Sequence, residues 1–322
     1  MIMNLFVPHM AAFAQITRSL SFVRGRGRPV LWLGLAVGVL LVGCGGGSGS
    51  DAGTAAAQTT STECQSKRSA AGQDVFLLIG QSNMVGYGAY FVAALDKTDP
   101  RIKQWTRAGV VAEATEPLDH PNFPFNAGRV GPGLAFARAY LTDLPSNRSV
   151  LLVPAAQGGS GFSDNRWNPG NDLYEQAVSR TLAALALQTG NCLGGILWSQ
   201  GEIDAINKVP ETSYRTALHT MIRTMRGQLA RGGTADAIPF VLGQFSNDWV
   251  GPTPTADQQA ILNVINGTPS LLPRTAVAST AGLTSNVTQG LDGAIHLDAA
   301  SQRIYGPRFR EALKVAVANG PK

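Results

Sequence analysis

Five short apolar runs after residue 72 constrain the fold of this chain more than any other feature. Each run is rich in Val, Ile, Leu or Phe and does not alternate with polar residues, as is typical of strands buried on both faces. Helix-like segments alternate with the runs, over residues 133–144, 173–187, 213–230, 257–265 and 301–318. This alternation predicts an α/β fold with a mostly parallel, doubly wound sheet of five strands. The five runs are Val75–Ile79, Val150–Pro154, Gly195–Trp198, Pro239–Leu242 and Thr275–Ala278.

Composition and charge exclude two classes of protein. Apolar residues make up 44% of the 322 residues and charged residues 15%, whereas a disordered chain is poor in apolar residues and rich in charged ones. The formal net charge of +5 falls to +1 without residues 1–44, because that segment holds four arginines and no acid. The remaining chain lacks the basic surface that phosphate binding needs, so we expect no nucleic-acid partner.

The first 44 residues have the pattern of an export signal. A basic stretch, Arg24–Arg28, precedes the apolar run Val30–Val42, which is shorter than the ~20 residues that a membrane-spanning helix needs. The run ends in Leu41-Val-Gly-Cys44, which resembles the lipobox of bacterial lipoproteins, where the cysteine is lipidated and becomes the new N-terminus. We therefore expect a lipoprotein-type signal over residues 1–44; a plain signal or an uncleaved anchor is the alternative.

Residues 45–72 are rich in Gly, Ser, Ala and Thr, and this composition predicts a flexible tether before a domain over residues 73–322. Lipidation of Cys44 would leave two cysteines, Cys64 and Cys192, and such a pair in an exported protein permits a disulfide. The alternative is two separate thiols. No His lies at ligand spacing from a cysteine, so we expect no metal.

Polar, glycine-rich segments follow the strands of the predicted sheet. Ligands of such sheets bind beyond the carboxyl ends of the strands, so these segments should meet in one cleft. Ser82 follows the first strand, where its hydroxyl could serve as a nucleophile or merely cap the next helix. His296 lies ahead of the last helix with acids on both sides, as a general base would. The segments are 80–84, 157–161, 199–204 and 292–298.

These segments carry a family resemblance. They read Gly80-Gln-Ser-Asn-Met84, Gln157-Gly-Gly-Ser160, Trp198-Ser-Gln-Gly-Glu-Ile-Asp204 and His296-Leu-Asp-Ala-Ala-Ser-Gln302, with Val130-Gly-Pro-Gly133 between the first two and Trp167 after the second. In this order they resemble the sialate O-acetylesterase and acetylxylan esterase branch of the SGNH hydrolases, over about residues 73–318. The resemblance implies a flavodoxin-like, three-layer α/β/α fold and a serine esterase that needs no cofactor.

The resemblance also implies roles for individual residues. Ser82 would be the nucleophile and His296 the base. The oxyanion donors would be the N–H of Ser82, a glycine for which we favour Gly158, and the side chain of Gln200. Further residues expected at the substrate are Gln81, Asn83, Gly159, Trp167 and Glu202, with Trp167 stacking on a sugar. For Glu202 the alternative is that it holds loops by hydrogen bonding.

The residue that orients His296 departs from the family pattern. The family usually has an acid three residues before the histidine, where this chain has Gly293. Asp292 precedes His296 by four residues, and Gly293 could let the loop bulge to bring Asp292 into register. We expect Asp292 to orient the imidazole; Asp298 and Glu202 are the alternatives.

The function that follows is an exported, lipid-anchored serine esterase that removes O-acetyl groups from a carbohydrate. Its anchor would face the periplasm or the cell surface, and sialate and xylan-type glycans are both open as substrates. One alternative is a non-catalytic, glycan-binding lipoprotein on the same scaffold, which the displaced Asp292 favours. Another alternative keeps the chemistry but uses esters that are not sugars.

Overall fold

The computed structural model describes residues 61–121, 128–291 and 293–320, all within one compact unit. The expected export signal, Cys44 and most of the expected tether lie outside the described residues. Asp292, the expected orienting acid, also lies outside them. Among the described residues, no helix is both long and apolar enough to cross a membrane.

Parallel strands form the centre of the fold, as the apolar runs predict. The spatial order β6-β1-β7-β8-β9 corresponds to 2-1-3-4-5 along the chain, which is the flavodoxin-like, doubly wound order. β1 pairs with β6 and with β7 in parallel, so that Leu77 lies between Val153 and Ile196. The five strands are β1 (Gly72–Gly80), β6 (Arg148–Pro154), β7 (Cys192–Ser199), β8 (Phe240–Gly243) and β9 (Thr275–Ala278).

Within the described residues the sheet has seven strands, so the expectation of five is wrong by two strands, which lie beyond β6. β3 (Ile102–Trp105) pairs in parallel with β6, and β4 (Val111–Glu113) pairs antiparallel with β3. Both were missed because they are short, and β4 is largely exposed, so neither forms a continuous apolar run. A separate two-stranded sheet joins β2 (Gly88–Ala89) to β5 (Arg129–Val130).

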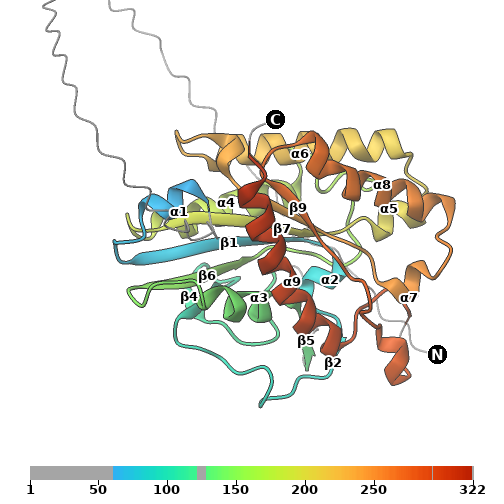
Figure 1. Ribbon diagram of the computed structural model, residues 1–322, viewed down its shortest axis with the longest axis horizontal. Coiled ribbons are helices and arrows are strands. Elements are labelled where there is room, and N and C mark those ends of the chain that lie inside the picture. The colour runs from blue at the N-terminus through green and yellow to red at the C-terminus, as the bar shows by residue number, and fades with distance from the viewer. Residues whose placement is uncertain (1–60, 122–127, 292, 321–322) are drawn as a thin grey trace, which may run out of the picture. The chain divides into compact units, whose positions relative to one another are not determined.

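Helices cover both faces of the sheet (Figure 1). Alternate residues of β1 separate two cores: Leu77 packs with α4, α6 and α8, whereas Phe76 packs with α3 and α9. This is the expected three-layer arrangement, and it leaves the two ends of the strands free to carry polar loops. The long helices are α3 (Pro132–Leu141), α4 (Asp172–Ala186), α6 (Glu211–Leu229), α8 (Ala256–Leu271) and α9 (Ala299–Ala318), and the short ones are α1 (Thr62–Ser66), α2 (Ser82–Val85), α5 (Glu202–Ile206), α7 (Asn247–Val250) and the 3₁₀ turns Ala235–Ala237 and Asn286–Gln289.

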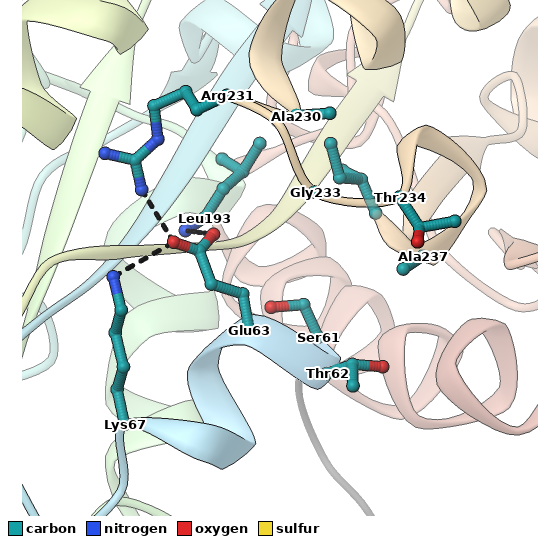
Figure 2. A pocket seen from close by; sticks show the side chains of 11 residues that line it. Ser61, Thr62, Glu63, Lys67, Leu193, Ala230, Arg231, Gly233, Thr234 and Ala237 are labelled. Atoms are coloured by element: carbon teal, nitrogen blue, oxygen red, sulfur yellow. Dashed lines mark hydrogen bonds and ion pairs between the residues drawn. The ribbon is translucent and has the colours of Figure 1, made fainter. Parts of the chain in front are cut away.

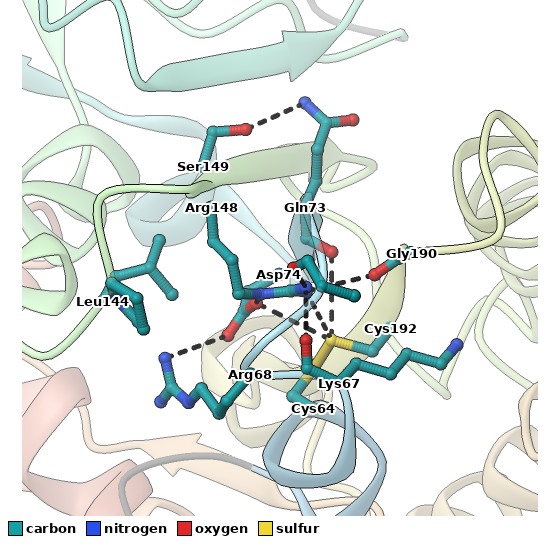
Figure 3. Close-up of polar contacts among 12 residues, drawn as sticks. Cys64, Lys67, Arg68, Gln73, Asp74, Leu144, Arg148, Ser149, Gly190 and Cys192 are labelled. Carbon is teal, nitrogen blue, oxygen red and sulfur yellow. Dashed lines mark hydrogen bonds and ion pairs between the residues drawn. A yellow bond between two sulfur atoms is a disulfide. The ribbon is translucent and has the colours of Figure 1, made fainter.

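Helix α1 corrects the expected extent of the tether. It lies within the 45–72 segment that we expected to be flexible, yet Cys64 is fully buried and forms a disulfide with Cys192 at the start of β7. Beside the disulfide, Arg148 donates to the Asp74 carboxylate (2.7 Å) and contacts the sulfur of Cys192 (3.2 Å; Figure 3). The covalent bond and these buried polar contacts order a segment whose composition alone favours flexibility.

The same end of the sheet holds a pocket of about 520 Å³ between α1, the start of β7 and the loop after α6 (Figure 2). Glu63 accepts hydrogen bonds there from Lys67, Arg231 and the N–H of Leu193. Its charge is therefore matched within the pocket. Since Leu193 is the second residue of β7, this pocket lies at the amino-terminal edge of the sheet, opposite the edge from which Ser82 emerges.

Candidate active site

Ser82 and His296, which are 214 residues apart in the chain, meet at the carboxyl edge of the sheet. The distance between the Ser82 Oγ and the His296 Nε2 is 3.0 Å, which is a hydrogen bond. Ser82 follows β1, and His296 lies on the loop between β9 and α9. This distance is the one that proton transfer from a serine hydroxyl to an imidazole requires.

The turn after β1 places the Ser82 hydroxyl. Gly80 has a φ of +123°, and a Cβ there would lie 2.1 Å from the carbonyl oxygen of Ser199, so only glycine fits. Gln81 occupies the N-cap position, and Ser82 is the first residue of α2. The hydroxyl of Ser82 is thus not the cap of the helix, and it is directed to His296 instead.

The loop before α9 holds His296, whose side chain is half-buried. Asp298 caps α9 by accepting from the N–H of Ser301 (2.7 Å), and it also accepts from the hydroxyl of Thr284 (2.5 Å). These bonds give Asp298 a structural role at the helix start. Since Asp292 lies outside the described residues, its role stays a prediction.

Tyr87 packs against His296, and the sequence analysis did not predict a role for it. Its ring stacks on the imidazole with the ring centroids 4.4 Å apart, and the Arg129 guanidinium lies 5.3 Å from the same ring. A Cβ built on Gly158 would lie 2.8 Å from the Tyr87 hydroxyl. Tyr87 therefore spans from the base to the expected oxyanion loop. Only its position five residues after Ser82 could have pointed to it.

Two backbone N–H groups are available for an oxyanion. Among the described residues, neither the N–H of Ser82 nor that of Gly158 donates to another backbone group. Gly158 is half-buried and the adjacent Gly159 is exposed with a φ of +67°, so the backbone of this loop is accessible from solvent. Free, fixed N–H donors are what an oxyanion hole needs.

Gln200 does not fit the oxyanion role in this arrangement. Its Nε2 donates to the Asp204 carboxylate (2.6 Å) and to the carbonyl oxygen of Ser160 (3.2 Å). A side-chain amide has two protons, so both are used inside the protein. Its Oε1 accepts from the hydroxyl of Tyr214 (3.1 Å). Gln200 is 1% exposed and thus links the loops after β6 and β7 inside the protein.

Three residues expected at the substrate form a buried polar layer beneath Ser82 and His296. Gln81 is 2% exposed, Asn83 is 1% exposed and Glu202 is fully buried. Gln81 accepts from the N–H of Ile203 (3.3 Å), and Asn83 donates to Glu202 (2.9 Å). Burial raises the pKa of the Glu202 carboxyl to about 7. These side chains support the site from behind. The expectation that Gln81 and Asn83 bind substrate is wrong in this arrangement, whereas the hydrogen bond of Glu202 agrees with the alternative that it holds loops.

Trp167 corrects another expectation. We expected it to stack on a sugar, but it is fully buried and packs edge-to-face on Trp198 with the ring centroids 5.2 Å apart. Its indole N–H donates to the hydroxyl of Ser160 (2.9 Å), which satisfies the polar end of the ring inside the protein. Trp167 therefore stabilises the loop after β6 from the core.

Candidate metal ligands converge at one place in the described part of the chain, and it is not in this site. Cys64, Asp74 and Cys192 lie close together, but the two sulfurs are joined in the disulfide.

Known proteins match this chain in sequence and in fold. Residues 72–314 match the family described as carbohydrate esterase, sialic acid-specific acetylesterase. The chain is 30% identical over 178 residues to a protein named a probable carbohydrate esterase of Arabidopsis thaliana, a match over 48% of this chain and 64% of the relative. It is 31% identical over 198 residues to a probable 9-O-acetyl-N-acetylneuraminic acid deacetylase of Escherichia coli, over 48% of this chain and 60% of the relative. The chain thus spans less than two thirds of the length of either relative.

Solved structures share the fold. The structure of an Arabidopsis thaliana protein aligns over 77% of this chain and 99% of its own, with a TM-score of 0.62 and 23% identity. The crystal structure of NanS aligns over 76% and 96% of the two chains, with a TM-score of 0.60 and 23% identity. Since the family match covers residues 72–314, nearly the whole of the described fold, this chain belongs to the sialic acid-specific acetylesterase family of carbohydrate esterases.

Proposed function

We propose that this chain is an exported serine esterase that removes O-acetyl groups from carbohydrate, with Ser82 as nucleophile and His296 as base. The observation that carries the proposal is the 3.0 Å hydrogen bond between the Ser82 Oγ and the His296 Nε2. Family membership supports acetylated sugars as the substrate class.

The proposed reaction proceeds in two steps. In the first, His296 takes the proton of Ser82 while the Oγ attacks the acetyl carbonyl carbon. The N–H groups of Ser82 and Gly158 stabilise the negative oxygen of the tetrahedral intermediate. His296 then gives its proton to the sugar oxygen, which leaves as an alcohol, and the acetyl group stays on Ser82.

In the second step, water replaces the sugar. His296 takes a proton from the water, whose oxygen attacks the acetyl-serine carbonyl. The intermediate collapses, the Ser82 oxygen regains the proton from His296, and acetate is released. We assign the orientation of His296 to Asp292, since Asp298 is used to cap α9.

Export and lipid anchoring at Cys44 form a second part of the proposal. The disulfide between Cys64 and Cys192 supports it, because disulfides persist in oxidising compartments and are rare in the cytosol. The Cys44→Ser variant should lose incorporation of labelled fatty acid. Retained incorporation would exclude Cys44 as the lipidated residue.

Acetate release tests the proposed reaction. The full chain and its Ser82→Ala variant are given 4-nitrophenyl acetate, a 9-O-acetylated sialic acid and acetylated xylan. We expect release that depends on Ser82 from at least one of the two sugar substrates. Cleavage of the nitrophenyl ester alone would refute a carbohydrate substrate of these classes, and release by the Ser82→Ala variant at the wild-type rate would refute the nucleophile.

A further inference from the structure

The side chain that follows the nucleophile holds the backbone on both sides of the base. Asn83 donates from Nδ2 to the carbonyl oxygen of Ile295 (3.0 Å), and its Oδ1 accepts from the N–H of Leu297 (3.0 Å). Ile295 and Leu297 are the two chain neighbours of His296. One buried amide therefore fixes the peptide groups that carry the imidazole, and it does so from the residue adjacent to Ser82.

Glu202 sets the orientation of that amide. Its Oε1 accepts from the Asn83 Nδ2 (2.9 Å), on the same side as the Ile295 carbonyl. Two acceptors on one side and the Leu297 N–H on the other leave a single orientation of the Asn83 amide that satisfies all three groups. A rotation of the amide by 180° would place oxygen against oxygen and N–H against N–H.

The side chain of Glu202 is energetically unfavourable for the folded state. The carboxyl is fully buried, and its Oε2 has no partner among the described residues. Its described partner is Asn83, and Asp204 on the same short helix adds a like charge nearby. A buried carboxyl with only one hydrogen-bonded oxygen lowers the stability of the fold. Glu202 therefore contributes by orienting Asn83 and not by stabilising the protein.

We propose that Glu202 is a positioning residue that acts through Asn83 on the peptide groups flanking His296, and so sets the distance between the His296 Nε2 and the Ser82 Oγ. This inference rests on the proposed function, in which these two atoms exchange a proton. The reach of the Glu202 side chain matters in this role, and its charge does not, because only the acceptor at Oε1 contacts Asn83.

Three variants of Glu202 separate the effect of the length of its side chain from the effect of its charge. Glu202→Gln keeps an acceptor oxygen at the same reach, whereas Glu202→Asp keeps the charge but is one methylene shorter. Glu202→Ala removes both. Asn83→Ala removes the clamp itself. Asn191→Ala is the matched control: Asn191 is also fully buried and also joins two backbone groups, the N–H of Gln73 and the carbonyl of Ala184, but at the opposite edge of the sheet.

The measurements are kcat and KM on 4-nitrophenyl acetate, the rate at which a fluorophosphonate labels Ser82, and the melting temperature. We expect Glu202→Asp, Glu202→Ala and Asn83→Ala to lower kcat by about 10- to 100-fold with KM within about twofold, since small misplacements of a catalytic group have effects of this size. Labelling should slow in proportion. Glu202→Gln should stay within about threefold of wild type, and Asn191→Ala should melt earlier with kcat unchanged.

Two results would overturn the inference while leaving the proposed function intact. One is a Glu202→Asp variant as active as Glu202→Gln, and the other is an Asn83→Ala variant that loses thermal stability but keeps kcat, as Asn191→Ala should. Failure of the proposed function would look different, because Ser82→Ala would then hydrolyse the ester or react with the fluorophosphonate like wild type. That outcome would overturn the inference as well.

Discussion

Reduction of the disulfide between Cys64 and Cys192 should destabilise the protein without changing its kcat. The bond closes a loop of 128 residues, and the loop-closure relation gives an entropy of about 17 cal/mol/K, or about 5 kcal/mol at 25 °C. Reduction removes no side-chain atoms, so the buried contacts between Arg148, Asp74 and Cys192 have the same groups available. Since domains of this kind are stable by about 5–15 kcal/mol, the loss is a large part of the total.

Urea unfolding of the oxidised and reduced protein measures this loss. With a slope of about 2–3 kcal/mol per molar urea, a loss of about 5 kcal/mol lowers the midpoint by about 2 M. The double variant Cys64→Ser with Cys192→Ser should behave like the reduced protein. The kcat of the folded molecules should not change, because Ser82 lies at the other edge of the sheet from Cys192. A midpoint shift below about 0.5 M, or a loss of kcat with the fold intact, would refute this reasoning.

Three further predictions concern single residues. Gly158→Ala should lower kcat about tenfold, because its Cβ would lie 2.8 Å from the Tyr87 hydroxyl and displace the ring that stacks on His296; adding Tyr87→Phe should restore most of the loss, and a double variant as slow as the single one would contradict the steric cause. Trp167→Ala should lower the free energy of unfolding by about 3–5 kcal/mol in urea titrations and leave KM unchanged, whereas a raised KM would return Trp167 to the substrate site. Burial raises the pKa of Glu116 from 4.5 to about 8, so the folded state holds a proton that the unfolded state has lost, and stability should fall as the pH rises from about 4.5 to about 8. Unfolding at several pH values should show a flatter profile for Glu116→Gln, and an unchanged slope would exclude Glu116 as its source.

The sequence predicts the central strands well because each is buried on both faces and leaves an uninterrupted apolar run. The edge strand β4 is missed because it is three residues long and mostly exposed, and its pairing with β3 is what makes it a strand. Composition fails at α1 for a related reason. The tether-like segment around Cys64 is ordered by a covalent partner 128 residues away, which local sequence cannot reveal.

The meeting of Ser82 and His296 is predictable for a physical reason that the residues around them do not share. Ser82 and His296 follow strands whose carboxyl ends must meet, so topology alone brings them together. Whether a side chain faces the cleft or the core is decided by the path of each loop. The loop after β6 folds back and buries Trp167, and Tyr87 reaches His296 from the short connection between α2 and β2, which has no sequence signal.

The buried polar layer is a second case in which the sequence does not tell whether a side chain faces substrate or the core. Asn83 and Glu202 belong to recognisable motifs, and polarity in a motif suggests contact with substrate. Their burial and mutual hydrogen bond instead make them part of the support for His296.

The most direct test of the central claim is to find where the acetyl group goes. The protein is mixed with excess 4-nitrophenyl acetate, quenched in acid during turnover, digested and examined by mass spectrometry. We predict an acetyl adduct on the peptide that contains Ser82, absent from Ser82→Ala and much slower to form in His296→Ala. An adduct on another residue that forms as fast as turnover, or full turnover by Ser82→Ala, would contradict the account.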